Sequence, residues 1–536
     1  MTRGAALGVR PDDLLEMTLG EVLEAHTRTH PEQAYLRVDA VDYTYAELWA
    51  LSGSVATALA RRGLLRGDRV TTWLPNGIEW VISALALARL GVVNVLTNSR
   101  FRSREVAELV TRSGSRGVIT EQSPDAEFAA ELGSSSELEW TVALESDWAD
   151  LTSTEAAEDE VAAAATGLTP QDTLYVIYTS GTTGLSKGSM TRHGPALKNT
   201  FNSGARMGFT DSDRLLCFLP MSHTFGAVNA FLNTFTQGAR LDLDRDFEPK
   251  VVLDAVSDRG ITALFGVPTH YTLLVTEYRN AGRTHDLSSL VKGCIAGGVI
   301  APELSEALEN DLKITGLTQA YGMTESTALI SQAAWDDPIE VRIGTTGRPM
   351  PDVEVRLVDG ETGAEVATGE PGDILIGGFG VHAGYLGMDR DPSMRDDGWW
   401  ATGDIGSQDA AGNLTILGRS KDMYKTSGFN VYPAEVEAFL VRHPSIAEAA
   451  IVGIPHPLKS ETGVAYLIPA PGSTIDEAEV QAFAREGLAG YKVPEHFVVV
   501  DDFPRSSATL KIQKHELRAR AIGQLSAGDQ LPGPNP

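Results

Sequence analysis

The alternation of apolar and polar residues predicts an α/β architecture for the first part of the chain. Residues 18–21 and 44–47 each place a threonine three residues before a glutamate, the pattern of a helix capping box, and apolar residues at helical spacing follow. Short apolar runs at 69–74 and 92–96 predict strands on either side of a helix at 78–90. Strand–helix–strand alternation with short connections indicates a parallel sheet covered by helices.

This pattern changes further along the chain. Residues 152–167 are rich in Ala and Glu with little apolar periodicity, and we expect them to form an exposed connection. Strand–helix alternation resumes at 213–265, and past Arg342 glycine-rich sequence with short strands predicts a smaller β subdomain. Near Gly418 a compact α+β pattern of about a hundred residues begins. The predicted units are residues 1–418, residues 419–525 and a Gly- and Pro-rich tail, 526–536, which we expect to be disordered.

Composition and charge narrow the class of protein. The chain has 536 residues, 42% of them hydrophobic and 22% charged, which is ordinary for a protein of two or more globular domains. Its net charge of −28 argues against nucleic acid and anionic membrane surfaces as partners. The two cysteines, Cys217 and Cys294, lie in apolar runs and indicate a reducing compartment without disulfides. We expect a cytoplasmic protein, because residues 1–20 lack the apolar core of a signal peptide and the most apolar run, 81–96, is too short to span a membrane.

One stretch, residues 178–188, combines hydroxyls, glycines and a lysine directly after a strand predicted at 174–177. Glycines let backbone N–H groups approach an anion closely, hydroxyls add donors and a lysine adds a point charge, so this stretch is a candidate polyphosphate cradle. It lacks the Gly-Lys-Ser/Thr ending of a Walker loop, and an ordinary surface loop is the alternative for either half of it alone. The candidate phosphate-binding residues are Thr179, Ser180, Gly181, Thr182, Thr183, Gly184 and Lys187.

Polar segments also follow other predicted strands. Gly297 and Gly298 come after a strand at 291–295, where a plain turn is the simplest interpretation of a glycine pair. The run Tyr321-Gly322-Met323-Thr324-Glu325 offers an aromatic face for a purine, a hydroxyl for a phosphate and a carboxylate for Mg²⁺. A core tyrosine beside a surface glutamate is the alternative interpretation of that run.

Three charged residues late in the chain are further candidates for nucleotide binding or catalysis. Asp404 follows a predicted tight turn and can accept hydrogen bonds from both hydroxyls of a ribose, or it can be an ordinary turn residue. Arg419 carries a fixed-charge fork suited to ribose or phosphate oxygens, or it belongs to a surface charge cluster with Lys421. Lys511 lies on a short loop before the C-terminal helix, where a lone lysine is more often solvated than catalytic.

In order and spacing, these segments resemble the motifs of the adenylate-forming superfamily, whose members are acyl- and aryl-CoA synthetases, adenylation domains of peptide synthetases and firefly-type luciferases. The resemblance covers residues 19–517 and is closest in pattern to the acyl-CoA synthetases. It implies an α/β fold in which a large N-terminal domain of doubly wound sheets with a β subdomain binds ATP and a carboxylic acid. A small, mobile α+β C-terminal domain would carry the catalytic lysine and swing about a hinge at Lys421.

The resemblance implies a two-step reaction. The carboxylate attacks the α-phosphorus of ATP to give an acyl-adenylate and pyrophosphate, and Lys511 stabilises the charge that develops there. Residues 179–187 would hold the β- and γ-phosphates, with Mg²⁺ near Glu325 and Thr324. The acyl group then passes to the thiol of coenzyme A.

The same resemblance assigns the nucleoside and the thiol. Tyr321 and Gly298 would flank the adenine, with Asp404 and Arg419 on the ribose. After the C-terminal domain has rotated, the loop centred on Gly428 would line the channel through which the pantetheine thiol reaches the acyl carbonyl.

Some positions depart from the acyl-CoA synthetase pattern. Proline usually stands at Ser186 and glycine at Leu510, and aliphatic residues are common at Tyr424 and Lys425. Leu510 restricts a loop that often uses the freedom of glycine, and Lys425 either reshapes the thiol channel or is a solvated charge. Two alternatives to a CoA ligase therefore stay open. One is an adenylating enzyme that passes the acyl group to a carrier protein or a separate acyltransferase, and the other is a non-catalytic ATP-binding module, which the intact set of charged candidates disfavours.

The acid itself is less defined. Residues 220–229 match the segment that lines the family's acyl pocket, where His223 would gate the thiol tunnel or be a core histidine. Peptide-synthetase domains for α-amino acids carry an aspartate near the position of Ala227, so an ordinary α-amino acid is disfavoured here. The pocket is expected to be mostly apolar and to suit fatty, aromatic or polycyclic acids equally well. Its candidate lining residues are Phe225, Asn229, Val299, Ile300 and Ala328.

Overall fold

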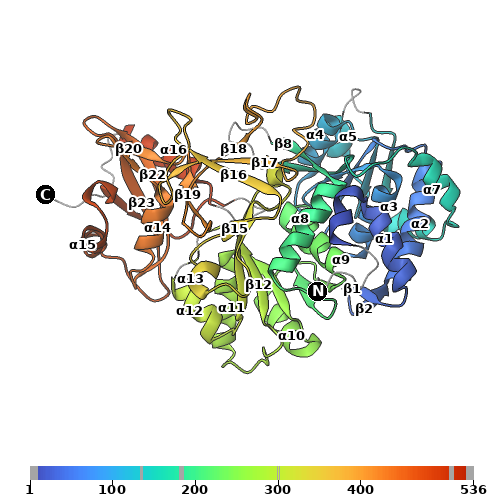
Figure 1. The fold of residues 1–536 in the computed structure, drawn as a ribbon, viewed down its shortest axis with the longest axis horizontal. Coiled ribbons are helices and arrows are strands. Elements are labelled where there is room, and N and C mark those ends of the chain that lie inside the picture. Colours follow the sequence, from blue (N-terminus) through green and yellow to red (C-terminus); the bar gives the residue numbers. More distant parts are fainter. Residues whose placement is uncertain are drawn as a thin grey trace.

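The computed structural model describes residues 10–132, 137–179, 186–298, 300, 302–505 and 512–526. In these residues the strands form four sheets, of which the two largest come first in sequence. Figure 1 shows the N-terminal elements at one end of the long axis of the molecule and the C-terminal elements at the other, with the strands β15 to β19 between them. The predicted α/β architecture, with a β subdomain and a smaller C-terminal unit, is confirmed.

The first large sheet has the strand order β6-β5-β3-β4-β7-β8 and is parallel except where β7 and β8 pair. Both predicted capping boxes are present, at Thr18 and Thr44, so α1 and α2 begin where the sequence predicts. The strands are β3 (Arg69–Trp73), β4 (Val93–Leu96), β5 (Gly117–Thr120), β6 (Trp140–Ala143), β7 (Thr173–Thr179) and β8 (Lys187–Arg192). The helices of this part are α1 (Leu19–Thr29), α2 (Tyr45–Arg61), α3 (Ile78–Leu90), α4 (Ser103–Ser113), α5 (Ala126–Leu132), α6 (Leu144–Thr152), α7 (Glu158–Ala164) and α8 (His193–Arg206).

Most of residues 152–167 are exposed, as predicted, but they are not a plain connection, because they contain a helix that the prediction missed. This helix, α7, packs against α2 and α3, and buries Val161 and Ala164. Its Glu158 accepts two hydrogen bonds from Arg89 of α3, at 2.7 and 2.6 Å, and the Arg89 side chain is only 3% exposed. A helix this short shows too few apolar positions for its period to be recognised, and its partner is an arginine inside an apolar helix.

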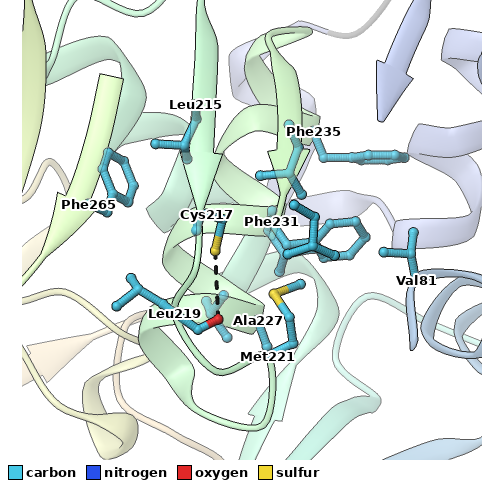
Figure 2. Packing of buried hydrophobic residues seen from close by; sticks show 14 of the residues in the cluster. Val81, Leu215, Cys217, Leu219, Met221, Ala227, Phe231, Phe235 and Phe265 are labelled. Atoms are coloured by element: carbon cyan, nitrogen blue, oxygen red, sulfur yellow. Dashed lines mark hydrogen bonds between the residues drawn. The ribbon is translucent and has the colours of Figure 1, made fainter. Parts of the chain in front are cut away.

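The second large sheet has the order β15-β14-β13-β12-β11-β9-β10-β1-β2, and its pairs from β13 to β1 are parallel. Its core includes both cysteines, which are buried free thiols, and Figure 2 shows Cys217 among the buried hydrophobic residues, with its Sγ donating to the carbonyl oxygen of Leu219 at 3.7 Å. The strands are β1 (Ala34–Val38), β2 (Val41–Thr44), β9 (Arg214–Cys217), β10 (Arg240–Leu243), β11 (Ala263–Gly266), β12 (Lys292–Ala296), β13 (Gly316–Tyr321), β14 (Ser331–Gln332) and β15 (Arg348–Pro349). The helices are a π-helix (Phe225–Leu232), α9 (Asn233–Gln237), α10 (Pro249–Arg259), α11 (Pro268–Asn280), α12 (Pro302–Asn310) and α13 (Ile339–Arg342).

The two smaller sheets follow in sequence. An antiparallel sheet contains β16 (Val353–Val358), β17 (Gly372–Gly378), β18 (Trp400–Gln408) and β19 (Leu414–Arg419). The C-terminal part contains β20 (Tyr424–Thr426), β21 (Phe429–Val431), β22 (Ile446–His456), β23 (Ser460–Pro469), β24 (His496–Val499), α14 (Pro433–Leu440), α15 (Glu477–Gly487) and α16 (Lys514–Ser526). The sheets change between Arg419 and Tyr424, close to the boundary predicted at residue 418, which itself stays a prediction. Residues 527–536 of the predicted tail lie outside the described residues, and no helix among those described is long and apolar enough to cross a membrane.

Candidate active site

The candidate residues gather at strand ends of both large sheets. In the first sheet, Thr179 ends β7 and Lys187 begins β8, and the two residues are partners in antiparallel register. In the second sheet, β12 and β13 are parallel neighbours, so Gly297 and Gly298, which follow β12, lie next to the end of β13 at Tyr321. Ligands of open α/β sheets bind outside the carboxyl ends of strands, where these residues lie. The remaining cradle candidates, Ser180, Gly181, Thr182, Thr183 and Gly184, lie outside the described residues, and their role stays a prediction.

Glu325 joins the two groups of strand ends. Its Oε1 accepts hydrogen bonds from the hydroxyl of Thr179 at 3.2 Å and from the hydroxyl of Tyr385 at 2.9 Å. The ammonium of Lys187 lies 4.9 Å from the centre of the Tyr385 ring. Burial and the adjacent Glu325 carboxylate raise the pKa of Tyr385, so its hydroxyl keeps the proton that it donates. The phosphate-binding candidates and the acidic candidate are therefore in contact.

The groups around Glu325 fit a magnesium ion. Both hydrogen bonds from described residues go to Oε1, which leaves Oε2 as an oxygen ligand of the kind that a hard cation prefers. Thr324 precedes it in a 3₁₀ turn and is buried. No group of three or more metal-binding side chains occurs in the described ranges. This agrees with the way Mg²⁺ is usually held in phosphate sites, by one or two carboxylates together with the phosphates of the substrate.

A strained loop carries Glu325. Thr327 and Ala328 both have positive φ, 52° and 78°, which costs non-glycine residues energy. Gly322 is required at the start of this loop, because a Cβ atom there would lie 1.9 Å from the carbonyl oxygen of Ala328. The fully buried Asn199 of α8 holds the loop from behind: its Nδ2 donates to the carbonyl oxygens of Thr327 and Leu329, both at 2.9 Å.

The ribose candidates form a second cluster. The hydroxyl of Tyr321 donates to Asp404 Oδ2 at 2.6 Å, and Arg419 Nε lies 3.6 Å from Asp404 Oδ1. Burial and the Asp404 carboxylate raise the pKa of Tyr321 well above its ordinary value, so this hydroxyl also remains a donor. The interpretation of Asp404 as a residue after a tight turn was wrong. It lies inside β18, opposite Arg419 of β19, and the preceding Gly403 has a φ of 75° beside an irregularity in the pairing of β18.

The segment expected to line the acid pocket folds back on itself. A Cβ atom at Gly226 would lie 2.4 Å from the carbonyl oxygen of Pro220, and His223 Nδ1 accepts a hydrogen bond from the Phe225 backbone at 3.2 Å. Residues Phe225–Leu232 of this segment form a π-helix, a form that often marks functional sites. The gating role of His223 stays a prediction.

The other residues expected to line the acid pocket are mostly buried. Asn229, Ile300 and Ala328 are buried, and the rings of Phe225 and Phe265 are stacked 6.0 Å apart. Val299 lies outside the described residues.

The remaining candidates lie in the C-terminal part of the chain, from Lys421 on. Lys421 lies in the connection from β19 to β20, next to Ser420, whose hydroxyl donates to Asp373 Oδ1 at 2.6 Å. Gly428 has a φ of 87° at the tip of the β20–β21 hairpin, where only glycine is unstrained. Lys425 is an exposed charge that pairs with Glu361 at 3.1 Å. Lys511 and Leu510 lie outside the described residues, so the catalytic role of Lys511 stays a prediction.

Sequence reasoning missed two residues that touch this site directly. Tyr385 stands next to Gly384 in a glycine-rich stretch after β17, and an aromatic residue in such a stretch was the only available signal. Asn199 occupies the middle of α8, where a buried asparagine leaves no pattern that points to a loop more than a hundred residues away.

Comparison with known proteins gives a consistent picture. The model of the AMP-binding enzyme family matches residues 23–386, and that of the AMP-binding enzyme C-terminal domain matches residues 435–509. A 3-[(3aS,4S,7aS)-7a-methyl-1,5-dioxo-octahydro-1H-inden-4-yl]propanoyl:CoA ligase of Mycobacterium tuberculosis is 34% identical over 512 residues, which cover 94% of this chain and 98% of that protein.

Two solved structures of similar fold contain bound nucleotides. The anthranilate CoA ligase AuaEII in complex with anthranoyl-AMP superposes with a TM-score of 0.86 at 26% identity, covering 97% of this chain and 100% of that one. The O-succinylbenzoate coenzyme A synthetase of Bacillus subtilis, in complex with ATP and magnesium ion, has a TM-score of 0.80 at 27% identity, covering 94% and 99%.

Proposed function

The chain belongs to the AMP-binding enzyme family, and from that premise we propose how its site joins a carboxylic acid to coenzyme A. The protein is an AMP-forming acid–thiol ligase. It activates the acid with ATP to an acyl-adenylate, releases pyrophosphate, and transfers the acyl group to the thiol of coenzyme A. The first step replaces a poor leaving group by a good one.

The position of Glu325 carries the assignment of the phosphate site. One carboxylate oxygen is held by Thr179, which ends β7, and by Tyr385, while Lys187 stands beside Tyr385. In our proposal, Thr179 and Lys187 bind the β- and γ-phosphates, and Glu325 with Thr324 holds Mg²⁺. The ion, when bound, neutralises phosphate charge as pyrophosphate leaves.

We assign the nucleoside to the cluster on β13, β18 and β19. Asp404 is buried, 6% exposed, and receives the Tyr321 hydroxyl on one oxygen and the Arg419 guanidinium near the other. These contacts orient the carboxylate, as a ribose-binding group must be oriented. Gly297 and Gly298 would let the adenine approach the backbone closely beside Tyr321, since neither carries a side chain.

The C-terminal unit would serve both steps in turn. Lys511 would bridge the carboxylate of the acid and the α-phosphate during adenylation, where a point charge stabilises the transition state. The backbone around Lys421 would then act as the hinge that brings the Gly428 hairpin to the site for the thiol. The support for this order is the resemblance of the motifs and the family match of residues 435–509.

For the acid, we propose a bulky, apolar carboxylic acid with a ring system. The buried pocket candidates Asn229, Ile300 and Ala328 carry no charge, and the half-buried Phe225 adds an aromatic ring that is stacked on the buried Phe265. A ring-bearing acid matches such surroundings better than a small dicarboxylate or an amino acid, whose second charge would stay unpaired. The named substrate of the mycobacterial relative, a bicyclic propanoate, supports the same class.

The test measures both products separately. The protein is incubated with ATP, Mg²⁺ and a panel of fatty, aryl and polycyclic acids, with and without coenzyme A, and mass spectrometry quantifies acyl-AMP and acyl-CoA. We expect acyl-AMP without coenzyme A and acyl-CoA with it, with the ring-bearing acids preferred. Glu325→Gln should suppress both products, whereas Glu340→Gln, at an exposed carboxylate of α13, should not.

Three outcomes would contradict parts of this assignment. If no acid releases AMP or pyrophosphate, the protein is not an adenylating enzyme. Acyl-AMP that accumulates in the presence of coenzyme A would show that the acceptor is another thiol, such as that of a carrier protein. A clear preference for straight-chain acids would refute the proposed substrate class.

A further inference from the structure

A buried chain of hydrogen bonds lies beside the proposed phosphate site. Ser189 Oγ is 2.7 Å from His382 Nδ1, and His382 Nε2 is 2.8 Å from Asp391 Oδ2. The indole N–H of Trp400 donates to the same Asp391 oxygen at 2.8 Å. Ser189 and the side chain of His382 are both 0% exposed. Because no substrate can reach this serine, the arrangement cannot serve as a nucleophilic triad and must act through its position.

The donor and the acceptor of each hydrogen bond between Ser189, His382 and Asp391 can be assigned. Although burial opposes it, the hydrogen bonds from His382, Ser393 and Trp400 hold the pKa of Asp391 below its usual value. An ionised Asp391 only accepts, so His382 donates to it through Nε2–H. In a neutral imidazole, Nδ1 is then the acceptor for the Ser189 hydroxyl. The polar side-chain groups of Ser189, His382 and Asp391 are all hydrogen-bonded, so one orientation of the His382 ring is strongly preferred.

These hydrogen bonds attach a second segment, residues 382–386, to β8. Ser189 is a residue of β8, and it forms an antiparallel bridge with Tyr385. The hydrogen bonds of this pairing are Ala383 N to Met190 O at 2.9 Å, Met190 N to Gly384 O at 3.0 Å and Leu386 N to Gly188 O at 2.8 Å. A pairing this short has a weakly defined register on its own. The side chain of His382, held by Ser189, fixes that register.

The fastened segment carries the groups that orient Glu325. The backbone N–H of His382 donates to the carbonyl oxygen of Glu325 at 2.9 Å, and three residues later the Tyr385 hydroxyl donates to its carboxylate at 2.9 Å. Lys187 lies two residues before Ser189, on the same face of β8, and its ammonium stands over the Tyr385 ring. A slip of this segment would therefore displace Tyr385 from both Glu325 and Lys187.

We propose that Ser189, His382 and Asp391 are positioning residues for adenylation, which fix Tyr385 so that one oxygen of Glu325 is held and the other faces the Mg²⁺ that accompanies ATP. This inference rests on the proposed function of Glu325 and adds the groups that orient it. The buried serine, histidine and aspartate touch neither nucleotide nor acid. They act through Tyr385, whose hydroxyl donates a hydrogen bond to the carboxylate.

The test compares nucleotide binding and adenylation at varied Mg²⁺. The affinity of the full-length protein for ATP is measured by calorimetry with and without Mg²⁺, and pyrophosphate release is followed across Mg²⁺ concentrations with an accepted acid. Tyr385→Phe and His382→Leu should raise the half-saturating Mg²⁺ concentration about 10- to 100-fold, as loss of a group that orients a metal ligand typically does. The KM for the acid should stay within about twofold, and His382→Gln should recover part of the loss because an amide can both donate and accept.

Controls separate positioning from folding. His285 makes a similar contact, with Nε2 at 3.0 Å from Asp254 Oδ1, far from this site in sequence, so His285→Gln should leave Mg²⁺ dependence unchanged. Thermal unfolding of each variant reports whether it is folded, and Tyr385→Phe keeps the ring and removes one hydroxyl only.

The results judge the two proposals separately. Equal Mg²⁺-linked ATP affinity in wild type, Tyr385→Phe and the folded His382 variants would overturn the positioning role. An equal loss of affinity for ATP with and without Mg²⁺ would overturn it as well. The binding arm needs no acid, so it decides this question even if no acid in the panel is adenylated and the proposed function fails.

Discussion

The loop that carries Glu325 depends on one buried asparagine. Replacing Asn199 by alanine removes the donor for the carbonyl oxygens of Thr327 and Leu329, each 2.9 Å from Nδ2. Thr327 and Ala328 hold left-handed backbone conformations at φ of 52° and 78°, which are strained for residues with a Cβ atom. Asn199→Ala therefore takes away the contacts that hold a strained loop.

The size of the effect follows from these contacts. Each buried carbonyl that loses its donor costs about 1–3 kcal/mol, and release of left-handed backbone returns about 1–2 kcal/mol per residue if the loop relaxes. Full relaxation would make the loss of stability small and the displacement of Glu325 large. We expect partial relaxation, with a loss of about 2–3 kcal/mol in the free energy of unfolding. A displacement of Glu325 by about 1 Å would lower the adenylation rate about 100-fold.

The assay pairs urea unfolding, followed by tryptophan fluorescence, with pyrophosphate release at varied ATP and Mg²⁺. Asn202 is a matched control on the same helix, since its Nδ2 donates to the single carbonyl oxygen of Pro351 at 3.3 Å. Asn202→Ala should cost about 1 kcal/mol and leave adenylation unchanged. If Asn199→Ala were both as stable and as active as the Asn202 variant, the loop would not need Asn199 and the reasoning would fail.

Three more predictions test the nucleotide site, the catalytic lysine and the response to acid. Asp404→Ala should raise the KM for ATP about 10- to 100-fold and abolish discrimination between ATP and 3′-deoxy-ATP in pyrophosphate release; discrimination that persists would argue against a ribose contact. Lys511→Ala should lower acyl-AMP formation about 100- to 1,000-fold while calorimetry shows unchanged ATP binding, and normal adenylation would exclude its assigned role. Burial lowers the pKa of His193 from 6.5 to about 4, so the folded protein binds fewer protons than the unfolded chain between these values. Stability should therefore be lost as pH falls from about 6.5 to about 4, by up to ~3 kcal/mol, and a His193→Gln variant with an equally steep decline of its urea midpoint would contradict this.

Elements with a strong local pattern could be predicted from the sequence. The helix Ile78–Leu90 was predicted with the ends that it has in the structure, because a long apolar run persists over the whole element. The helix Glu158–Ala164 was missed, since seven residues with two buried side chains give no clear period. Residues near a distinctive motif, such as Tyr321, could be recognised as candidates, but their contacts could not.

Contacts across the chain leave no local pattern. Ser189 and His382 are 193 positions apart, and neither a serine in a strand nor a histidine after glycine-rich sequence indicates a partner. The pairing that brings them together is a short addition to the edge of β8, made by a glycine-rich segment. Only the tertiary arrangement of the first sheet and the segment after β17 determines that contact.

Glu325 lies where three segments that are distant in sequence meet. Its carboxylate is held by Thr179 from the first large sheet and by Tyr385 from the segment after β17, while its own loop follows β13 of the second sheet. A carboxylate that binds Mg²⁺ beside a triphosphate must be fixed against repulsion from the phosphates, and a single loop offers too few contacts for that. Three structural units that converge on one side chain supply them. The motif that contains Glu325 therefore identifies the residue, whereas its orientation belongs to the fold as a whole.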